Sequence, residues 1–91
     1  MNAFSPRILK SAIRQLKKLD PSIAKRIIAQ ITWLAEHFDE IKAEALKGDL
    51  AGLFKYRHGD YRIIYEPLHR EKVIVIHEIG HRGEIYKQTR P

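Results

Sequence analysis

Three short runs of β-branched and aromatic residues in the last third of the chain constrain its fold most strongly. They extend over residues 53–58, 61–66 and 72–79. Runs of this length and composition are typical of β-strands. Residues 58–60 form a tight connection between the first two runs, and residues 67–71 form a longer one before the third. Because short connections join neighbouring antiparallel strands, the pattern predicts a three-stranded antiparallel meander.

Two helical patterns come before these runs. Ser5 and Pro6 predict a helix start, with a hydroxyl cap followed by proline at the first helical position, which leaves only Phe4 for a very short leading strand. Asp20 and Pro21 end this helix and begin a second one in the same way. A connection this short predicts an antiparallel helix hairpin. The apolar residues of the two helices recur every three or four positions, at Ile8, Leu9, Ala12, Ile13, Leu16, Leu19, Ile23, Ile27, Ile28, Ile31, Leu34 and Ala35.

The segment between the second helix and the first strand has a mixed pattern. Residues 41–46 predict a short helical turn, and the glycines that follow predict a connection into the sheet. The whole pattern therefore predicts an α+β fold, in which an N-terminal helix hairpin packs on one face of a small antiparallel β-sheet. The other face of the sheet is then left to water or to a ligand.

Composition limits the class of protein. The 91 residues suffice for one domain over residues 1–91, and 44% hydrophobic with 31% charged residues argues against disorder. The absence of cysteine excludes disulfides, a thiolate zinc site and a cysteine nucleophile. No apolar run reaches the roughly 18 residues of a membrane span, and the N-terminal segment lacks the apolar core of a signal peptide. We therefore expect a cytoplasmic protein without a membrane partner.

The formal charge of +6 favours a polyanionic partner, either a nucleic acid or an acidic protein. Both the helical part and the strand part of the chain are basic, so neither is a detachable basic tail. We interpret the cations of the helix hairpin as a solvated surface in preference to a nucleic-acid groove binder. These cations are Lys10, Arg14, Lys17, Lys18, Lys25 and Arg26.

A second group of cations lies within the predicted strands. Because strand side chains alternate between faces, Lys55 and Arg57 point to one face and the aromatic residues beside them point to the other. Arg62 follows on the second strand, and Arg82 and Tyr86 follow the third run, where they are placed to close over the same face. Cations gathered on one sheet face predict a polyanion site and chemistry on a phosphate.

The segment KGDLAGLFKYRHGDYRIIYE, followed by IGHRGEIY, resembles the RelE/ParE superfamily of bacterial toxins from toxin-antitoxin systems. The resemblance extends over nearly the whole chain, from FSPRILKSAIRQLKKLD onward, and implies two helices followed by an antiparallel sheet. RelE-type members are ribosome-dependent endoribonucleases that cut mRNA, whereas ParE-type members poison DNA gyrase without being nucleases. The resemblance implies a cognate antitoxin as partner, and for the RelE type also the ribosome and mRNA. It implies that the functional residues are Lys55, Arg57, Arg62, Arg82 and Tyr86.

Cleavage of RNA by its own 2′-hydroxyl needs a base, an acid and charges that stabilise the dianionic phosphorane. No cofactor is implied, so cations have to supply that stabilisation. Arg62 and Arg82 suit bidentate contacts with the phosphate. Lys55 is the first candidate for the base, and Tyr86 is suited to orient the nucleophile or to stack on a nucleobase. His81 is a further acid or base candidate, because histidine titrates near neutrality.

Each of these residues also has a simpler interpretation. His81 is otherwise a turn residue, and Arg62 otherwise forms an ordinary surface ion pair with Glu66 or Glu78. His77 and His81 are four residues apart at a strand end, a spacing that does not favour a zinc site. Our prediction is a RelE-type toxin that cuts translated mRNA. The alternative is a ParE-type inhibitor of DNA gyrase.

Overall fold

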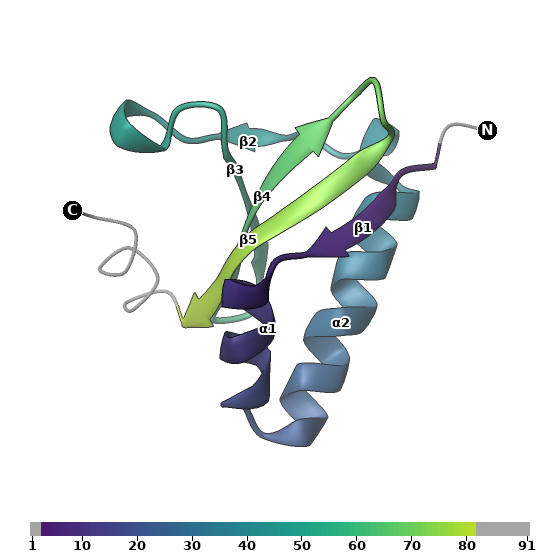
Figure 1. The fold of residues 1–91 in the computed structure, drawn as a ribbon. Coiled ribbons are helices and arrows are strands. Elements are labelled where there is room, and N and C mark those ends of the chain that lie inside the picture. Colours follow the sequence, from purple (N-terminus) through teal and green to yellow (C-terminus); the bar gives the residue numbers. More distant parts are fainter. Residues whose placement is uncertain (1–2, 82–91) are drawn as a thin grey trace.

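The computed structural model describes residues 3–81 of the chain, and in this part five strands form one sheet with two α-helices against it (Figure 1). The strand order is β1-β5-β4-β3-β2. The elements in chain order are β1 (Ser5–Ile8), α1 (Lys10–Lys17), α2 (Pro21–Glu36), β2 (Glu44–Ala45), β3 (Phe54–His58), β4 (Tyr61–Leu68) and β5 (Val73–His81), with short 3₁₀ turns at Phe38–Glu40 and Gly48–Leu50.

The core lies between the two helices and one face of the sheet. Alternate residues of β4 and β5 form the side of the core that the sheet supplies. The apolar stripes of α1 and α2 form its opposite side. This confirms the predicted α+β class with helices on one face. The buried core residues are Phe4, Ala12, Leu16, Ile27, Ile31, Leu34, Ala35, Ile63, Tyr65, Ile74, Ile76 and Ile79.

The meander of β3, β4 and β5 is antiparallel, as predicted. Gly59 in the β3–β4 turn has a φ of 60°, a conformation that glycine adopts without steric strain. Strand β4 is longer than predicted and includes Pro67, which pairs with Ile74. A register shift between Ile64 and Tyr65 gives β5 one extra residue, so the two strands bend locally at this point.

The predicted start of the first helix is wrong, because Ser5–Ile8 form strand β1. This strand runs parallel to β5, with Ser5 opposite Val73 and Ile8 opposite Ile76, so the sheet is mixed. The pair of Ser5 and Pro6 does not start a helix, because pairing of this segment with β5 overrides the local signal. Proline is tolerated here because β1 is an edge strand. The amide of Leu9 then donates to the carbonyl of Ile76, and α1 begins one residue later.

The second helix begins as predicted, with Pro21 in its first turn after Asp20. The Asp20 carboxylate accepts a hydrogen bond from the Ser22 hydroxyl at 3.0 Å and caps no backbone amide. The helical turn predicted over residues 41–46 is wrong, because Glu44–Ala45 form the short strand β2 on the edge of β3. Among the described residues, no helix is both long and apolar enough to cross a membrane.

Candidate functional site

Three predicted site residues lie together on the sheet face opposite the helices. Arg57 on β3 and Arg62 on β4 are direct cross-strand partners, and Lys55 lies two residues before Arg57 on the same face. Phe54 and Tyr56 point the other way and pack against the core, as the alternation predicts. We call Lys55, Arg57 and Arg62 the cationic face.

Arg62 is the unusual member of the cationic face, because its charged side chain is buried. The residue is only 8% exposed. Its Nε and Nη1 atoms are buried and have no hydrogen-bond partner within residues 3–81. Buried donors without a partner are costly, and a buried charge more so. A bound anion would provide the acceptors that these nitrogens lack.

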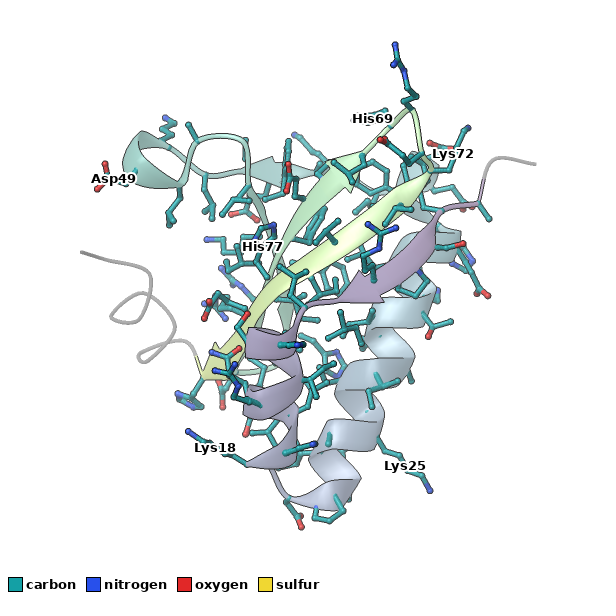
Figure 2. The ribbon with its side chains drawn as sticks, viewed as in Figure 1. Lys18, Lys25, Asp49, His69, Lys72 and His77 are labelled. Carbon is teal, nitrogen blue, oxygen red and sulfur yellow. The ribbon has the colours of Figure 1, made fainter. Side chains whose placement is uncertain are left out.

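The surface ion pair with Glu66 or Glu78, which was the simpler interpretation of Arg62, is absent from the described part of the chain. Glu66 is paired with His77 instead, at 3.0 Å from Nε2, and Figure 2 shows His77 on the sheet. Glu78 accepts a hydrogen bond from Nε2 of Gln15 at 2.9 Å. Both carboxylates are therefore engaged elsewhere, and the positive charge of Arg62 is not neutralised by them.

Lys55 has a partner that the sequence did not reveal. Its Nζ atom lies 3.2 Å from Oε2 of Glu44, which is directly opposite on β2. The lysine side chain is 18% exposed and the glutamate side chain 60% exposed. Sequence reasoning missed Glu44 because it assigned this segment to a helical turn. Only the β2–β3 register brings the carboxylate to the cationic face.

His81 lies apart from the cationic face. It is the last residue of β5 and the cross-strand partner of Tyr61, and the two rings form an edge contact with centroids 5.8 Å apart. Tyr61 packs against the core on the helix side of the sheet, so His81 is on that side as well. Arg82 and Tyr86 lie outside the described residues, and their predicted roles stay predictions.

Two tyrosines mark the helix side of β3 and β4. Burial raises the pKa of Tyr65 to about 12, and the negative charge of Glu44 and the neighbouring Tyr56 add to this effect. Burial also raises the pKa of Tyr56, whose hydroxyl donates to Oε1 of Gln30 at 3.0 Å. Tyr65 is a fully buried member of the core. Both hydroxyls stay protonated at neutral pH, so neither supplies a charge.

The described residues offer no metal-binding cluster of three or more histidine, aspartate or glutamate side chains. The cationic face and the Glu44 side chain opposite it offer two guanidinium groups, a lysine side chain and one carboxylate. Guanidinium groups match the oxygens of a phosphate and can bind them in a bidentate manner. The arrangement suits the binding of a phosphate and the stabilisation of additional negative charge on it.

Comparison with known proteins places the chain in a family. Residues 7–86 match the family model described as the ParE toxin of the type II toxin-antitoxin system, parDE. A curated relative, Toxin RelG of Mycobacterium tuberculosis (strain ATCC 25618 / H37Rv), is 32% identical over an alignment of 91 positions. The alignment covers 93% of this chain and 98% of the relative.

Solved structures agree with this match. The toxin-antitoxin complex RelBE2 from Mycobacterium tuberculosis has a TM-score of 0.81 at 28% identity, covering 88% of this chain and 92% of that one. The archaeal RelE-RelB complex from Pyrococcus horikoshii OT3 has a TM-score of 0.70 at 27% identity, covering 89% and 97%. A free mutant of the E. coli toxin RelE has a TM-score of 0.73 at 19% identity, covering 96% of this chain and 94% of that one. At this identity the comparison shows a shared fold and nothing more. Family model and relatives together show that the chain belongs to the RelE/ParE superfamily of toxins from type II toxin-antitoxin systems.

Proposed function

We propose that this toxin is a RelE-type endoribonuclease that cuts translated mRNA on the ribosome and so inhibits translation. The observation that carries the proposal is Arg62, a buried guanidinium on the cationic face with two nitrogens that lack partners within residues 3–81. A fold that retains such a group without neutralising it gains nothing in stability. The group gains its partner when a phosphate binds.

The reaction follows from these groups. The 2′-hydroxyl gives its proton to the base while its oxygen attacks the adjacent phosphorus, and a new P–O bond forms. The bond from phosphorus to the 5′-oxygen breaks, and the leaving 5′-oxygen takes up a proton from the acid. The products are a 2′,3′-cyclic phosphate and a 5′-hydroxyl. Arg62 and Arg57 would stabilise the negative charge that grows on the phosphorane oxygens. Arg82 and Tyr86 are proposed to complete the site, as the family resemblance implies.

The geometry adds a second candidate for the general base. The Nζ atom of Lys55 is engaged by the Glu44 carboxylate at 3.2 Å, whereas a base has to receive the proton of the 2′-hydroxyl. The Glu44 carboxylate is a second proton acceptor on this face, and it lies directly opposite Lys55. We therefore propose Glu44 as the base and Lys55 as the group that positions it. His81 is a less favoured candidate for the acid, because it lies on the other side of the sheet.

We further propose that a cognate antitoxin binds and inhibits this toxin. Solved structures of relatives from Mycobacterium tuberculosis and Pyrococcus horikoshii are toxin-antitoxin complexes. Blocking the cationic face would prevent phosphate binding, and an acidic or amphipathic segment would have the matching charge. Toxicity that persists when the antitoxin is bound would contradict this.

The cleavage chemistry can be tested on a translated mRNA that carries a single 2′-deoxynucleotide at the mapped cut site. Attack by the 2′-oxygen is then impossible, so cleavage at that site should disappear while neighbouring cuts persist. The 3′ ends of the normal products should carry a 2′,3′-cyclic phosphate. Continued cleavage of the deoxy substrate at the same bond would contradict the proposed mechanism.

The second candidate function is inhibition of DNA gyrase, in which the same fold binds a protein target. The match to the ParE toxin family model favours it, as does the partial neutralisation of the cationic face by Glu44. This function predicts that the toxin inhibits supercoiling by purified gyrase and leaves translated mRNA intact.

A further inference from the structure

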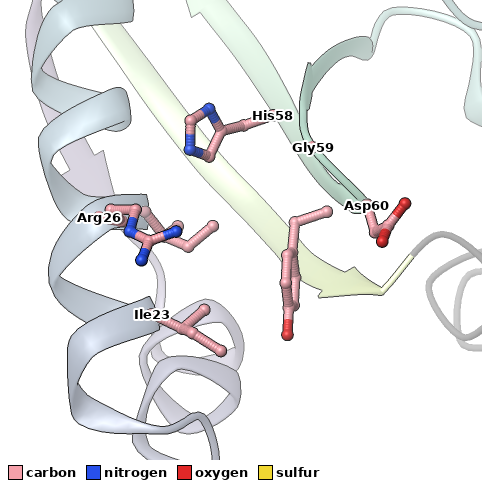
Figure 3. Close-up of a pocket in the computed structure, with 7 residues that line it drawn as sticks. Ile23, Arg26, His58, Gly59 and Asp60 are labelled. Atoms are coloured by element: carbon pink, nitrogen blue, oxygen red, sulfur yellow. The ribbon is translucent and has the colours of Figure 1, made fainter.

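A small hollow lies on the helix side of the molecule, where the β3–β4 turn meets α2. Its volume is about 180 Å³. Ile23 and Ile27 of α2 line it together with Tyr61, and two basic residues, Arg26 and His58, reach into it from α2 and β3 (Figure 3). Apolar side chains therefore form part of the lining, and Arg26 and His58 add basic groups to it.

The two basic side chains of this hollow have no acidic partner. Within the described residues, neither the Arg26 nor the His58 side chain forms an ion pair or a hydrogen bond. Asp60 also lines the hollow, but Figure 3 shows its carboxylate directed away from both. Two nitrogen donors that line one hollow from α2 and β3 favour an oxyanion between them, because hydrogen bonds from a cationic donor to an anion are stronger than neutral ones.

The size and the position of the hollow favour a phosphate of RNA over an acidic protein segment. A volume of about 180 Å³ is suited to one oxyanion and is too small for a helix. Residues 57 and 58 are consecutive, as are 61 and 62, so the turn has the cationic face on one side and the hollow on the other. A single strand that crosses the turn would contact both sides.

The basic lining continues beyond Tyr61. A neighbouring hollow of about 350 Å³ has Tyr61 as one wall and is also lined by Lys18 and His81. Lys18 comes from the end of α1 and His81 from the end of β5, so both hollows open at the same end of the sheet. Positive charge on this end would attract a polyanion that extends past the first hollow.

We propose that Arg26 and His58 form a second phosphate site, which binds a backbone phosphate of single-stranded RNA next to the phosphate held on the cationic face. This inference rests on the proposed function, since it assumes an RNA substrate. The second site would hold the RNA in register across the β3–β4 turn and would take no part in bond cleavage.

The test uses the full chain and a short 2′-O-methyl RNA, which cannot be cleaved by 2′-hydroxyl attack. Imidazole NMR signals of His58 should shift saturably on addition of this RNA. In Arg26→Gln the affinity should fall about fivefold, and the log–log slope of affinity against salt should decrease by about 0.7, the value for one lost phosphate contact with a single strand. Lys25→Gln is the matched control, because it removes the same charge from the neighbouring position of α2, where Figure 2 shows the side chain pointing outward.

Three outcomes would overturn the inference. The first is an equal loss of affinity in Lys25→Gln and Arg26→Gln. The second is a shift of the His58 signals by inorganic phosphate but not by RNA, which would indicate a site for free phosphate. The third is a shift by an acidic peptide but not by RNA, which would indicate a protein partner. Failure of the second site leaves cleavage by the cationic face intact, whereas failure of the proposed function removes cleavage and leaves RNA binding at His58 measurable.

Discussion

At the scale of single residues, Arg62 lowers the stability of the fold and is proposed to serve phosphate binding. Its guanidinium is buried with unpartnered nitrogens within the described part of the chain, and its cross-strand neighbour Arg57 carries the same charge. Like charges directly opposite each other destabilise a strand pair. The Arg62→Met variant should therefore be more stable than the wild type, by about 1–2 kcal/mol in urea unfolding, and should lose at least about 10²-fold in cleavage rate.

Arg57 provides the matched control for this prediction. It is also a cation of the same face but is exposed, so Arg57→Met should change the free energy of unfolding by no more than about 0.5 kcal/mol. A strong loss of stability in Arg62→Met would show that the guanidinium has partners in the folded state and would remove the main argument for a phosphate site.

Glu44 allows a second prediction at this scale. If its carboxylate is the general base, Glu44→Gln should lower the cleavage rate by roughly 10²- to 10⁴-fold. The variant should stay within about 0.5 kcal/mol of the wild type in stability, because an ion pair with an exposed partner contributes little. Partial recovery of the rate in Glu44→Asp, with an altered pH dependence, would distinguish a base from a residue that only holds Lys55. An unchanged rate in Glu44→Gln would exclude Glu44 as the base.

At the scale of elements, α1 completes the edge of the sheet where β1 ends. The Gln15 side chain accepts a hydrogen bond from the amide of Ile79 at 2.6 Å and donates one to Glu78. The Ser11 hydroxyl donates to the carbonyl of His77 at 2.9 Å. Side chains of α1 thus satisfy backbone groups of β5 that no strand pairs. This explains how an edge strand of four residues suffices.

The Gln15→Leu variant tests this arrangement. It removes the acceptor for the Ile79 amide, so it should cost about 1–3 kcal/mol in unfolding free energy. Hydrogen exchange at Ile79 should accelerate more than elsewhere in β5. The exposed neighbour Arg14 is the control, and Arg14→Leu should stay within about 0.5 kcal/mol of the wild type. Unchanged exchange at Ile79 would mean that another group satisfies this amide.

The elements also show what a sequence can predict. The meander and α2 were predictable because their signals are local: alternation, apolar periodicity and the short connections around Gly59 and Pro21. Strands β1 and β2 were not, because each is defined only by the strand it pairs with. Ser5 pairs with Val73 and Glu44 with Lys55, and neither segment carries a strand pattern of its own.

The candidate site follows the same rule. Alternation along β3 placed Lys55 and Arg57 on one face, and β4 added Arg62 by its register with β3. Glu44 could not be found in this way, since it reaches the site only through β2. The position of His81 on the helix side follows from its pairing with Tyr61 at the end of the β4–β5 ladder, which requires the whole register including its irregularity.

At the scale of the whole molecule, Tyr65 links the core to alkaline stability. The pKa of a tyrosine in an unfolded chain is about 10, and burial raises that of folded Tyr65 to about 12. Between these values the unfolded state binds fewer protons than the folded state, so stability falls as pH rises from about 10 to 12. In Tyr65→Phe this loss should be smaller, and urea midpoints of the two proteins should diverge over that window. Parallel curves would contradict the buried position of the hydroxyl.

For the molecule as a whole, we propose a small basic domain that cuts mRNA on the ribosome with a buried arginine. The most direct measurement is primer extension on a translated mRNA with purified ribosomes, compared with the same RNA without ribosomes and with the Arg62→Gln variant. We expect cuts that need the ribosome and disappear in Arg62→Gln. Intact mRNA in every reaction, or cuts that persist unchanged in Arg62→Gln, would contradict the account.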